Sequence, residues 1–203
     1  AQYPSYTYTN VGTYNVTLIV SPTTACADTS HATVIVNPIP VVTASNNGPI
    51  CAGQNVNLSS ATANPSPTYS WSGPNSFSSS QQNTSVTNLS TTSTYTVAVT
   101  SLGCTGTGTT TVTVNPIPVA TAGATANPIC AGQTLHLLGT SSLTGSTYQW
   151  TGPNGFSSTQ QNPNIPNAQS INAGTYTLIV TKSGCSSSVS TVTITINPIP
   201  VAP

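Results

Sequence analysis

Charged side chains are almost absent from this 203-residue chain. Asp28 is its one acidic residue and Lys182 its one basic residue, which gives a net charge of zero beside two histidines. Binding to nucleic acid or to an anionic membrane surface depends on clusters of Lys and Arg, so the composition argues against both kinds of partner. The apolar residues, 36% of the total, are spread in short alternating runs, and none is long enough for a transmembrane helix. We therefore expect no nucleic-acid partner and no membrane insertion.

The residues that enzymes use for acid–base chemistry are equally scarce. General acid–base catalysis commonly needs two carboxylates or a carboxylate beside a histidine, and Asp28 is the one carboxylate side chain available. His31 and His136 lie in strand-like runs at positions expected to face solvent. Calcium sites need several carboxylates, which the chain lacks. It also has no Cys-x-x-Cys motif of the kind that binds zinc. We predict a protein that is not an enzyme and that binds no cofactor and no metal.

The sequence is instead organised as a tandem repeat. The segment Ile-Cys-Ala-Gly-Gln at 50–54 recurs 79 residues later at 129–133, and Trp-x-Gly-Pro-Asn at 71–75 recurs by the same offset at 150–154. A constant offset over several landmarks is typical of repeated structural units.

The tetrapeptide Asn-Pro-Ile-Pro follows a strand-like run in three places and sets the expected boundaries. Two prolines around one isoleucine favour an extended, stiff spacer, so we predict that each copy is a joint between domains. The predicted division is an incomplete domain at 1–36, a linker at 37–40, a domain at 41–114, a linker at 115–118, a domain at 119–196 and a linker at 197–203.

Alternating apolar and polar residues predict β-strands in both full domains. Val56 and Leu58 alternate with polar neighbours, as do Leu135 and Leu137, and no apolar run has the helical period of 3.6 residues. The strand number and the turn spacing fit a β-sandwich of about seven strands. The predicted fold class is therefore all-β, with tandem sandwich domains in an extended array.

Residues 1–36 predict only a two-stranded hairpin. Tyr14, Val16, Leu18 and Val20 alternate with polar or β-branched residues, and a second run follows a turn. Two strands alone are marginally stable in water. We expect these residues to complete a sandwich whose other strands precede residue 1 or come from a neighbouring molecule.

Both full domains carry a pattern that resembles immunoglobulin-like domains, in which a Gly-x-x-apolar-x-Leu strand is followed by a Trp and then by a Tyr-containing strand. The matching positions are 53–58, Trp71 and 94–97 in the first domain, and 132–137, Trp150 and 173–178 in the second. Residues 6–18 resemble the end of a polycystic-kidney-disease-type (PKD) domain. The combination of these motifs with the Asn-Pro-Ile-Pro joints resembles repeat modules of giant surface adhesins in Bacteroidetes-type bacteria, including gliding adhesins and other type IX secreted proteins.

The immunoglobulin pattern implies roles for the aromatic residues. Trp71 and Trp150 occupy the position of the core tryptophan, while Tyr14, Tyr95 and Tyr176 resemble the tyrosine whose hydroxyl bonds back to nearby backbone. We expect all five to be core residues. A carbohydrate-binding module would instead need an exposed aromatic platform. The side chains that would form such a platform are Trp71, Trp150, Tyr69 and Tyr148.

The usual disulfide between the two sheets is missing from this pattern. Its cysteines would fall at Ser60 and Val97 in the first domain, and at Gly139 and Leu178 in the second. The five cysteines present are displaced from those positions, and in a secreted chain we expect them to be oxidised. They are Cys26, Cys51, Cys104, Cys130 and Cys185.

Two disulfide pairings are compatible with the cysteine positions. Cys51 with Cys104, and Cys130 with Cys185, would keep each bond within one domain. In a sandwich of the immunoglobulin topology, however, such cysteines lie at opposite ends of a strand about 20 Å long, whereas a disulfide needs Cα atoms within about 7 Å. Cys51 with Cys185, across the joint, avoids that conflict and is slightly favoured, with the two bonds within domains as the alternative.

The resemblance implies a structural segment of an extracellular bacterial adhesin or filament, acting as a stiff stalk with adhesive or assembly contacts. The alternative is a carbohydrate-binding or accessory module of a secreted enzyme. The expected partners are neighbouring repeats and other copies in a filament, together with surface glycans or a substratum. The acceptor pattern Asn-x-Ser/Thr marks possible glycosylation at Asn15, Asn57, Asn83 and Asn88.

Overall fold

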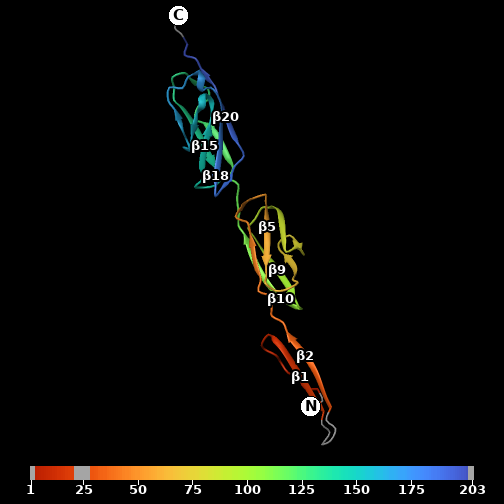
Figure 1. Cartoon of the computed structure of the whole chain (residues 1–203). Helices are drawn as coiled ribbons and strands as arrows, with labels where there is room; N and C mark the ends of the chain where they lie inside the picture. Colours follow the sequence, from red (N-terminus) through yellow and green to blue (C-terminus); the bar gives the residue numbers. More distant parts are fainter. Residues whose placement is uncertain (1–2, 21–27, 201–203) are drawn as a thin grey trace. The chain divides into compact units, whose positions relative to one another are not determined.

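The computed structural model describes residues 3–20 and 28–200, and the regular structure of these residues is almost entirely β-strand (Figure 1). Two 3-10 turns, η1 (Pro153–Gly155) and η2 (Ser170–Asn172), are the exceptions within the described part of the chain. None of the described residues belongs to a helix long and apolar enough to cross a membrane. The all-β fold class expected from the sequence is confirmed.

The chain divides into two compact units, which are described separately. The first unit contains the hairpin at the start of the chain and most of the first sandwich. The second contains the second sandwich, together with two short segments that flank strands of the first. The ranges are Ala1–Gly48, Val56–Val86 and Ser93–Val112 for the first unit, and Pro49–Asn55, Thr87–Thr92 and Thr113–Pro203 for the second.

The hairpin consists of β1 (Gly12–Val20) and β2 (Asp28–Val36), which pair antiparallel over nine residues each. The Tyr14 hydroxyl donates to the Asn10 carbonyl at 2.9 Å, which is the backbone contact expected of this tyrosine. Tyr14 is half-buried and packs on Tyr8, so the described hairpin alone does not bury it in a core. Among the described residues the hairpin has no opposing sheet, and the side chain of Leu18 is 56% exposed.

The first sandwich is built from two antiparallel sheets whose strands follow the predicted alternation. On β9, for example, Tyr95, Val97 and Val99 point inward and are buried, while the residues between them are more exposed. One sheet has the order β3 (Thr43–Asn46), β5 (Gln54–Ala61), β8 (Asn83–Leu89), and the other β10 (Cys104–Val112), β9 (Ser93–Ser101), β6 (Thr68–Ser72), β7 (Ser78–Ser79).

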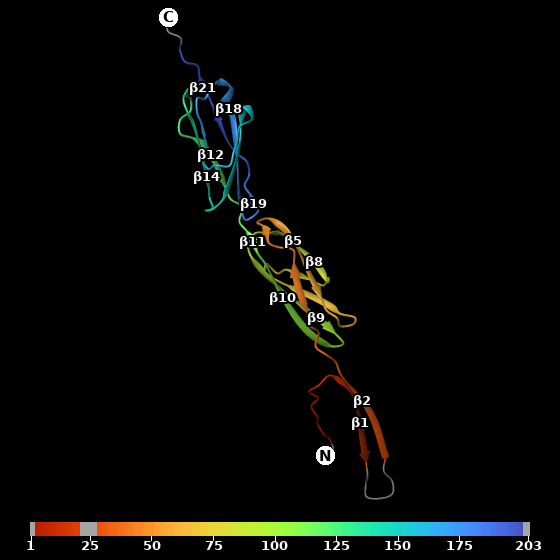
Figure 2. The same ribbon diagram turned by 60° about the vertical axis from the view of Figure 1, so that its left-hand side comes forward.

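The second sandwich repeats this topology (Figure 2). Its longest strand, β18 (Gly174–Lys182), pairs with β15 on one side and with β19 and β20 on the other. One sheet has the order β12 (Ala120–Ala124), β14 (Leu135–Ser141), β17 (Asn164–Ile165), and the other contains β16 (Ser157–Ser158), β15 (Thr147–Thr151), β18, β19 (Cys185–Ser186) and β20 (Ser190–Ile194).

Two short parallel pairs complete the strands. β4 (Ile50–Cys51) pairs with β11 (Val114–Asn115), and β13 (Ile129–Cys130) pairs with β21 (Ile196–Asn197). Each pair joins the Ile-Cys of a repeated motif to the asparagine that opens an Asn-Pro-Ile-Pro segment. Both members of each pair lie in the second compact unit.

A buried tryptophan is held in each core by a glutamine. Trp150 is fully buried, and its Nε1–H donates to the Gln161 carbonyl at 3.1 Å. The side-chain amide of Gln161 in turn donates to the Gly139 carbonyl at 2.9 Å. In the first sandwich Trp71 donates to the Gln82 carbonyl, and the Gln82 amide donates to Ser60. Both tryptophans are therefore core residues with their one polar atom satisfied.

Packing explains why a core disulfide does not fit the second sandwich. A Cβ atom added at Gly139 would come within 2.7 Å of the Gln161 carbonyl and 3.2 Å of both Trp150 and Leu178. The Trp ring and the glutamine backbone thus fill the space that a cysteine side chain at position 139 would need.

The second core also contains the corner tyrosine. Tyr176 is buried, and its hydroxyl donates to the Asn172 carbonyl at 2.8 Å. Burial raises the pKa of Tyr176 above its usual value. Burial likewise raises the pKa of Tyr95 in the first sandwich, and a hydrogen bond with the Ser93 side chain opposes part of that effect.

Hydroxyl groups pair across the exposed faces of both sandwiches. Thr94 and Thr111 lie on neighbouring strands with their Oγ1 atoms 2.8 Å apart, and in the second sandwich Thr151 of β15 and Thr177 of β18 also pair through their hydroxyls. Further pairs of this kind are Thr100–Thr105, Thr175–Thr193 and Thr181–Ser186. These cross-strand contacts occupy positions where other sheets often place ion pairs.

Replacing Gly139 by Ala should destabilise the second sandwich by about 1–3 kcal/mol, because the added methyl group overlaps the Gln161 carbonyl and crowds Trp150. Gly123 is the matched control. It lies in the same sheet, a Cβ there would be 3.9 Å from its nearest neighbour, and Gly123→Ala should be neutral or stabilising by up to about 1 kcal/mol. Urea unfolding of both variants measures the difference, and equal effects would contradict the packing argument.

Stability should change little between about pH 5 and 9 and should fall in stronger alkali. The folded protein holds the phenol protons of Tyr95 and Tyr176 more tightly than the unfolded chain does. Their contribution to stability is complete below the usual Tyr pKa of about 10 and is lost as the pH rises through the raised values. Unfolding by urea across this range tests the prediction. Tyr176→Phe should be less stable at neutral pH, because it loses the bond to Asn172, but should lose less on going to high pH.

Candidate functional site

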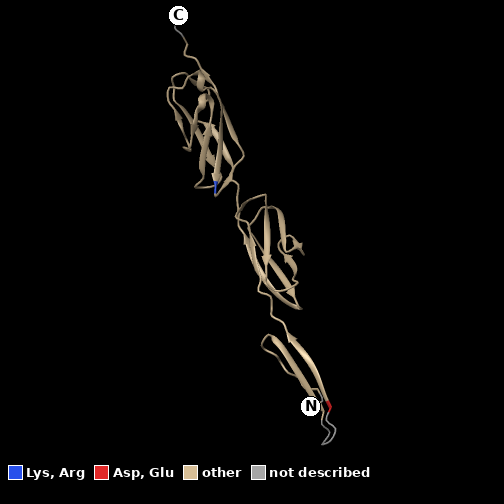
Figure 3. Cartoon of the chain, in the orientation of Figure 1, with Lys and Arg blue, Asp and Glu red and all other residues tan. Residues whose placement is uncertain are grey.

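In the described part of the chain, the histidine, aspartate and lysine side chains each bond to a different local partner. His136 Nδ1 lies 2.6 Å from Asn164 Oδ1, and His31 Nδ1 lies 3.1 Å from the Thr17 hydroxyl, with both imidazoles exposed as expected. Asp28, at the start of β2, accepts from a neighbouring backbone N–H, and Lys182, at the end of β18, donates to a backbone carbonyl (Figure 3). Over the described ranges, no three His, Cys, Asp or Glu side chains gather where a metal ion could bind.

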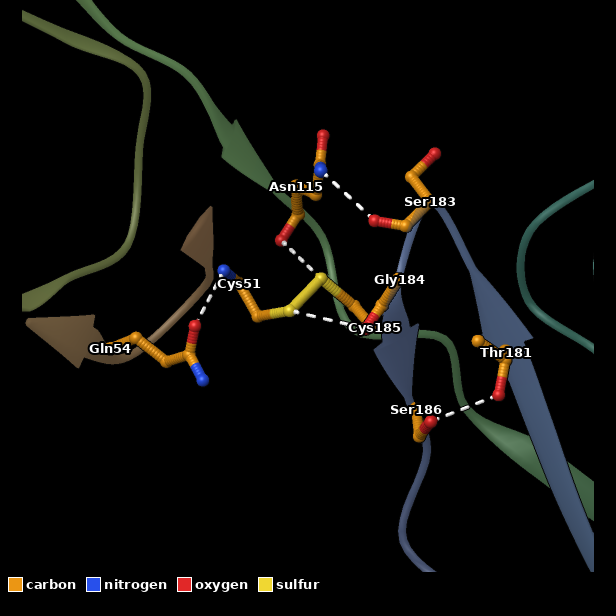
Figure 4. The surroundings of a disulfide bond; sticks show 8 residues. All are labelled: Cys51, Gln54, Asn115, Thr181, Ser183, Gly184, Cys185 and Ser186. Atoms are coloured by element: carbon orange, nitrogen blue, oxygen red, sulfur yellow. Dashed lines mark hydrogen bonds between the residues drawn. A yellow bond between two sulfur atoms is a disulfide. The ribbon is translucent and has the colours of Figure 1, made fainter. Parts of the chain in front are cut away.

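A network of hydrogen bonds surrounds a disulfide bond between Cys51 and Cys185 (Figure 4). The two Cα atoms are 5.6 Å apart, although the residues are 134 positions apart in sequence. Cys51 comes from the first sequence repeat and Cys185 from the second, and both lie in the second compact unit. This is the pairing that the strand geometry favoured over the two bonds within repeats.

A tight turn presents Cys185. Ser183 and Gly184 connect β18 to β19 with φ values of +49° and +79°, and Lys182 pairs with Cys185 across them. Two consecutive residues with positive φ are typical of a two-residue hairpin turn, and the glycine tolerates its conformation without strain. Cys185 itself is 1% exposed.

Cys51 is held by its own backbone. The residue pairs with Asn115 in the parallel β4–β11 ladder, and its N–H donates to the Gln54 side chain at 3.0 Å. The neighbouring Ala52 N–H donates to the Asn115 carbonyl at 2.9 Å. These hydrogen bonds hold the strand that carries Cys51 in place independently of the disulfide.

Asn115 links the two sides of this site. Its carbonyl accepts from Ala52 on the Cys51 side, and its side-chain amide donates to the Ser183 carbonyl of the turn at 3.1 Å. The Cys185 sulfur also lies 3.9 Å from the Asn115 carbonyl oxygen. From the sequence, Asn115 was expected only to be the first residue of a proline-rich linker. The signal for its structural role is that an asparagine opens all three Pro-Ile-Pro segments.

Two further cysteines form no disulfide within the described part of the chain, so their expected oxidation stays a prediction. Cys104 is half-buried and Cys130 is exposed, and both are free thiols. The alternative pairs Cys51–Cys104 and Cys130–Cys185 are therefore absent, because Cys51 and Cys185 are bonded to each other. Because Cys51 of the first repeat is bonded to Cys185 of the second, Cys104 and Cys130 each lack a partner within their own repeat. Cys26 lies outside the described residues.

The aromatic residues considered for a sugar-binding platform are not exposed as such a platform requires. Trp71 is 1% exposed and Trp150 is 0% exposed, while Tyr69 and Tyr148 are half-buried. The asparagines of the glycosylation pattern, in contrast, all have exposed side chains. They are Asn15, Asn57, Asn83 and Asn88, and their glycosylation stays a prediction.

Comparison with solved structures supports the fold. The chain is similar to the N-terminal eight Ig domains of Down Syndrome Cell Adhesion Molecule isoform 1.30.30, with 13% identity and a TM-score of 0.51, covering 94% of this chain and 28% of that one. It is also similar to murine CEACAM1b, with 13% identity, a TM-score of 0.44 and coverage of 77% and 100%. A three-Ig structure of titin domains I67–I69, in an E-to-A variant, has 10% identity, a TM-score of 0.47 and coverage of 80% and 67%.

No family model matches the sequence, and no curated protein matches it either. The fold is nevertheless clear from the sheet order, the buried tryptophans and the similarity to a tandem Ig structure. The chain has immunoglobulin-like β-sandwich domains in tandem.

Alkylation of the denatured protein without reductant should label Cys104 and Cys130 and spare Cys51 and Cys185. In the native protein Cys130 should react faster than Cys104, because its side chain is more exposed. Peptide mass spectrometry in a Cys26→Ser background measures both results. Labelling of Cys51 together with protection of Cys104 would overturn the assigned connectivity.

Proposed function

We propose that this chain is a structural repeat segment of an extracellular bacterial surface adhesin or filament, in which it acts as a stiff stalk that carries tension. The observation that supports this role most directly is the bond between Cys51 and Cys185, because it joins successive sequence repeats and not the two sheets of one sandwich. A bond in that position affects how the chain transmits force.

The path of tension follows from the connectivity. When the chain is pulled from residues before Cys51 and after Cys185, force passes through the two sulfur atoms. The segment of chain between the two cysteines, which are 134 positions apart, therefore carries no tension. This segment includes most strands of both sandwiches. A pulling force cannot extend the enclosed chain as long as the disulfide is intact, which is a useful property for a surface stalk.

The chemistry of the remaining surface agrees with a stalk. Its exposed faces present hydroxyl pairs, and the chain has one acidic and one basic residue in total. A disulfide of this kind is typical of proteins that mature outside the reducing cytosol. Together with the resemblance of the repeat motifs to Bacteroidetes-type adhesins, these features favour a bacterial cell-surface location, with neighbouring repeats, other copies and surface glycans as contacts.

The alternative of a carbohydrate-binding module loses its main support. Trp71 and Trp150 are buried and bonded to Gln82 and Gln161, so neither can stack on a sugar ring without the core opening. An accessory role beside a catalytic domain needs no site in this chain, and no contact among the described residues favours it over a stalk.

Single-molecule pulling should distinguish the oxidised and reduced protein. With the chain held at both ends, reduction should add about 450 Å of extended chain, because the 134-position separation between the cysteines enters the path of force. The Cys51→Ser/Cys185→Ser double variant should show the longer extension without any reductant. If the oxidised wild-type protein already gave the full extension, the tension-bearing role would be rejected.

The binding alternative has its own measurement. A stalk segment should show no saturable binding to soluble oligosaccharides in calorimetry. Saturable binding that is lost when Tyr69 or Tyr148 is changed to Ala would instead favour the carbohydrate-binding module.

A further inference from the structure

The free thiol of Cys104 sits in a copy of the turn that presents Cys185. Leu102 and Gly103 have φ values of +49° and +81°, and Cys104 follows them as Cys185 follows Ser183 and Gly184. The side-chain amide of Asn37 donates to the Leu102 carbonyl at 2.9 Å, and the Cys104 sulfur lies 3.6 Å from the Asn37 carbonyl oxygen. In the bonded site the Asn115 amide donates to the Ser183 carbonyl at 3.1 Å, and the Cys185 sulfur lies 3.9 Å from the Asn115 carbonyl oxygen.

The free thiol of Cys130 sits in a copy of the strand that presents Cys51. The Ala131 N–H donates to the Asn197 carbonyl at 2.9 Å, the same distance as from Ala52 to Asn115. The Ile129 N–H donates to the Thr195 carbonyl at 3.1 Å, as Ile50 does to Thr113. The parallel pairing of Cys130 with Asn197 likewise repeats that of Cys51 with Asn115.

From this duplication we infer that Cys104 and Cys130 represent the two complementary halves of one kind of disulfide site, and that each forms a disulfide with a cysteine of an adjoining immunoglobulin-like repeat of the same polypeptide. Cys130 bonds to the cysteine of a Ser-Gly-Cys-type turn in a repeat that follows Asn197. Cys104 bonds to the cysteine of an Ile-Cys-Ala-Gly-type segment in a repeat that precedes Asn37. The inference goes beyond the stalk function and does not depend on adhesion.

The asparagine in the bonded site indicates that the partner repeat belongs to the same polypeptide and not to a separate copy of the chain. In the bonded site one residue, Asn115, serves both halves, through its carbonyl and through its side-chain amide. In the free halves these roles belong to two residues, Asn197 for Cys130 and Asn37 for Cys104. If a second copy docked its Cys104 turn on Cys130, its Asn37 would have to occupy the place already taken by Asn197. A repeat that continues through Asn197 has no such conflict.

The oxidation step balances with a glutathione-type disulfide as the oxidant. One cysteine thiolate attacks oxidised glutathione, forms a mixed disulfide and releases one glutathione thiol. The partner thiolate then attacks the protein sulfur of the mixed disulfide and releases the second glutathione. Two protein thiols lose two electrons and two protons, and one glutathione disulfide becomes two thiols.

The test is to extend the chain by one repeat. Residues 1–200 are followed directly by a second copy of residues 119–203, in a Cys26→Ser background, and the product is refolded with oxidised glutathione at about 10 µM protein. Non-reducing digestion should yield a peptide pair linking Cys130 to the cysteine that corresponds to Cys185 in the added copy. Because the partner is tethered at millimolar effective concentration, this bond should exceed bonds between separate molecules by about 100-fold.

Three variants of the extended chain make the result specific. Changing the added copy's cysteine at the position of Cys185 to Ser should leave Cys130 open to alkylation. Asn197→Ala should slow the new bond, since it removes the amide that would donate to the incoming turn. Asn37→Ala is the matched control, because it removes the equivalent amide beside Cys104 and should leave the rate at Cys130 unchanged.

Two outcomes would overturn the proposal. The first is a Cys130 that stays fully alkylatable while tryptophan fluorescence shows the added repeat to be folded. The second is efficient bonding of Cys130 to Cys104 between separate 203-residue chains, which would make a second copy the partner. Both results are independent of the pulling experiment, so failure here would leave the stalk function standing.

Discussion

The structure depends on one asparagine having two different hydrogen-bonding groups. The backbone carbonyl of Asn115 completes the short parallel ladder with β4, and its side-chain amide holds the turn between β18 and β19. No apolar residue could serve both elements, and a residue with a shorter or acidic side chain would lose the donor. With both elements held, the two sulfur atoms are brought together by the backbone, and the covalent bond secures a geometry that hydrogen bonds have already defined.

Much of the fold was predictable because it follows from short-range alternation. The strands around Val56, Leu135 and Tyr176 were expected from a period of two, and the burial of Trp71 and Trp150 followed from their spacing. The disulfide partner of Cys51 could be favoured from strand length alone, since a bond within the repeat would have to span a whole strand. These features require only a pattern and a distance.

Other features depend on contacts between distant residues and left little trace in the pattern. Gln82 and Gln161 lie in a repeated Gln-Gln-Asn segment, but the sequence gives no sign that their amides reach across to the neighbouring sheet and that their carbonyls accept from tryptophan. Composition suggests that Cys104 and Cys130 are oxidised, but the repeat register determines whether a partner for each is present in this chain. Tyr14 was placed in a core by analogy with Tyr176, yet its hairpin supplies only one layer.

The pairs of threonine and serine hydroxyls across the exposed strands have a consequence for where such a surface can operate. A neutral hydroxyl pair carries no net charge, so dissolved ions do not weaken it as they weaken an exposed ion pair. With one acid and one base in the whole chain, the same strand contacts would hold in dilute water and in brine. The hydroxyl contacts across the exposed strands therefore do not depend on the ionic strength of the solution.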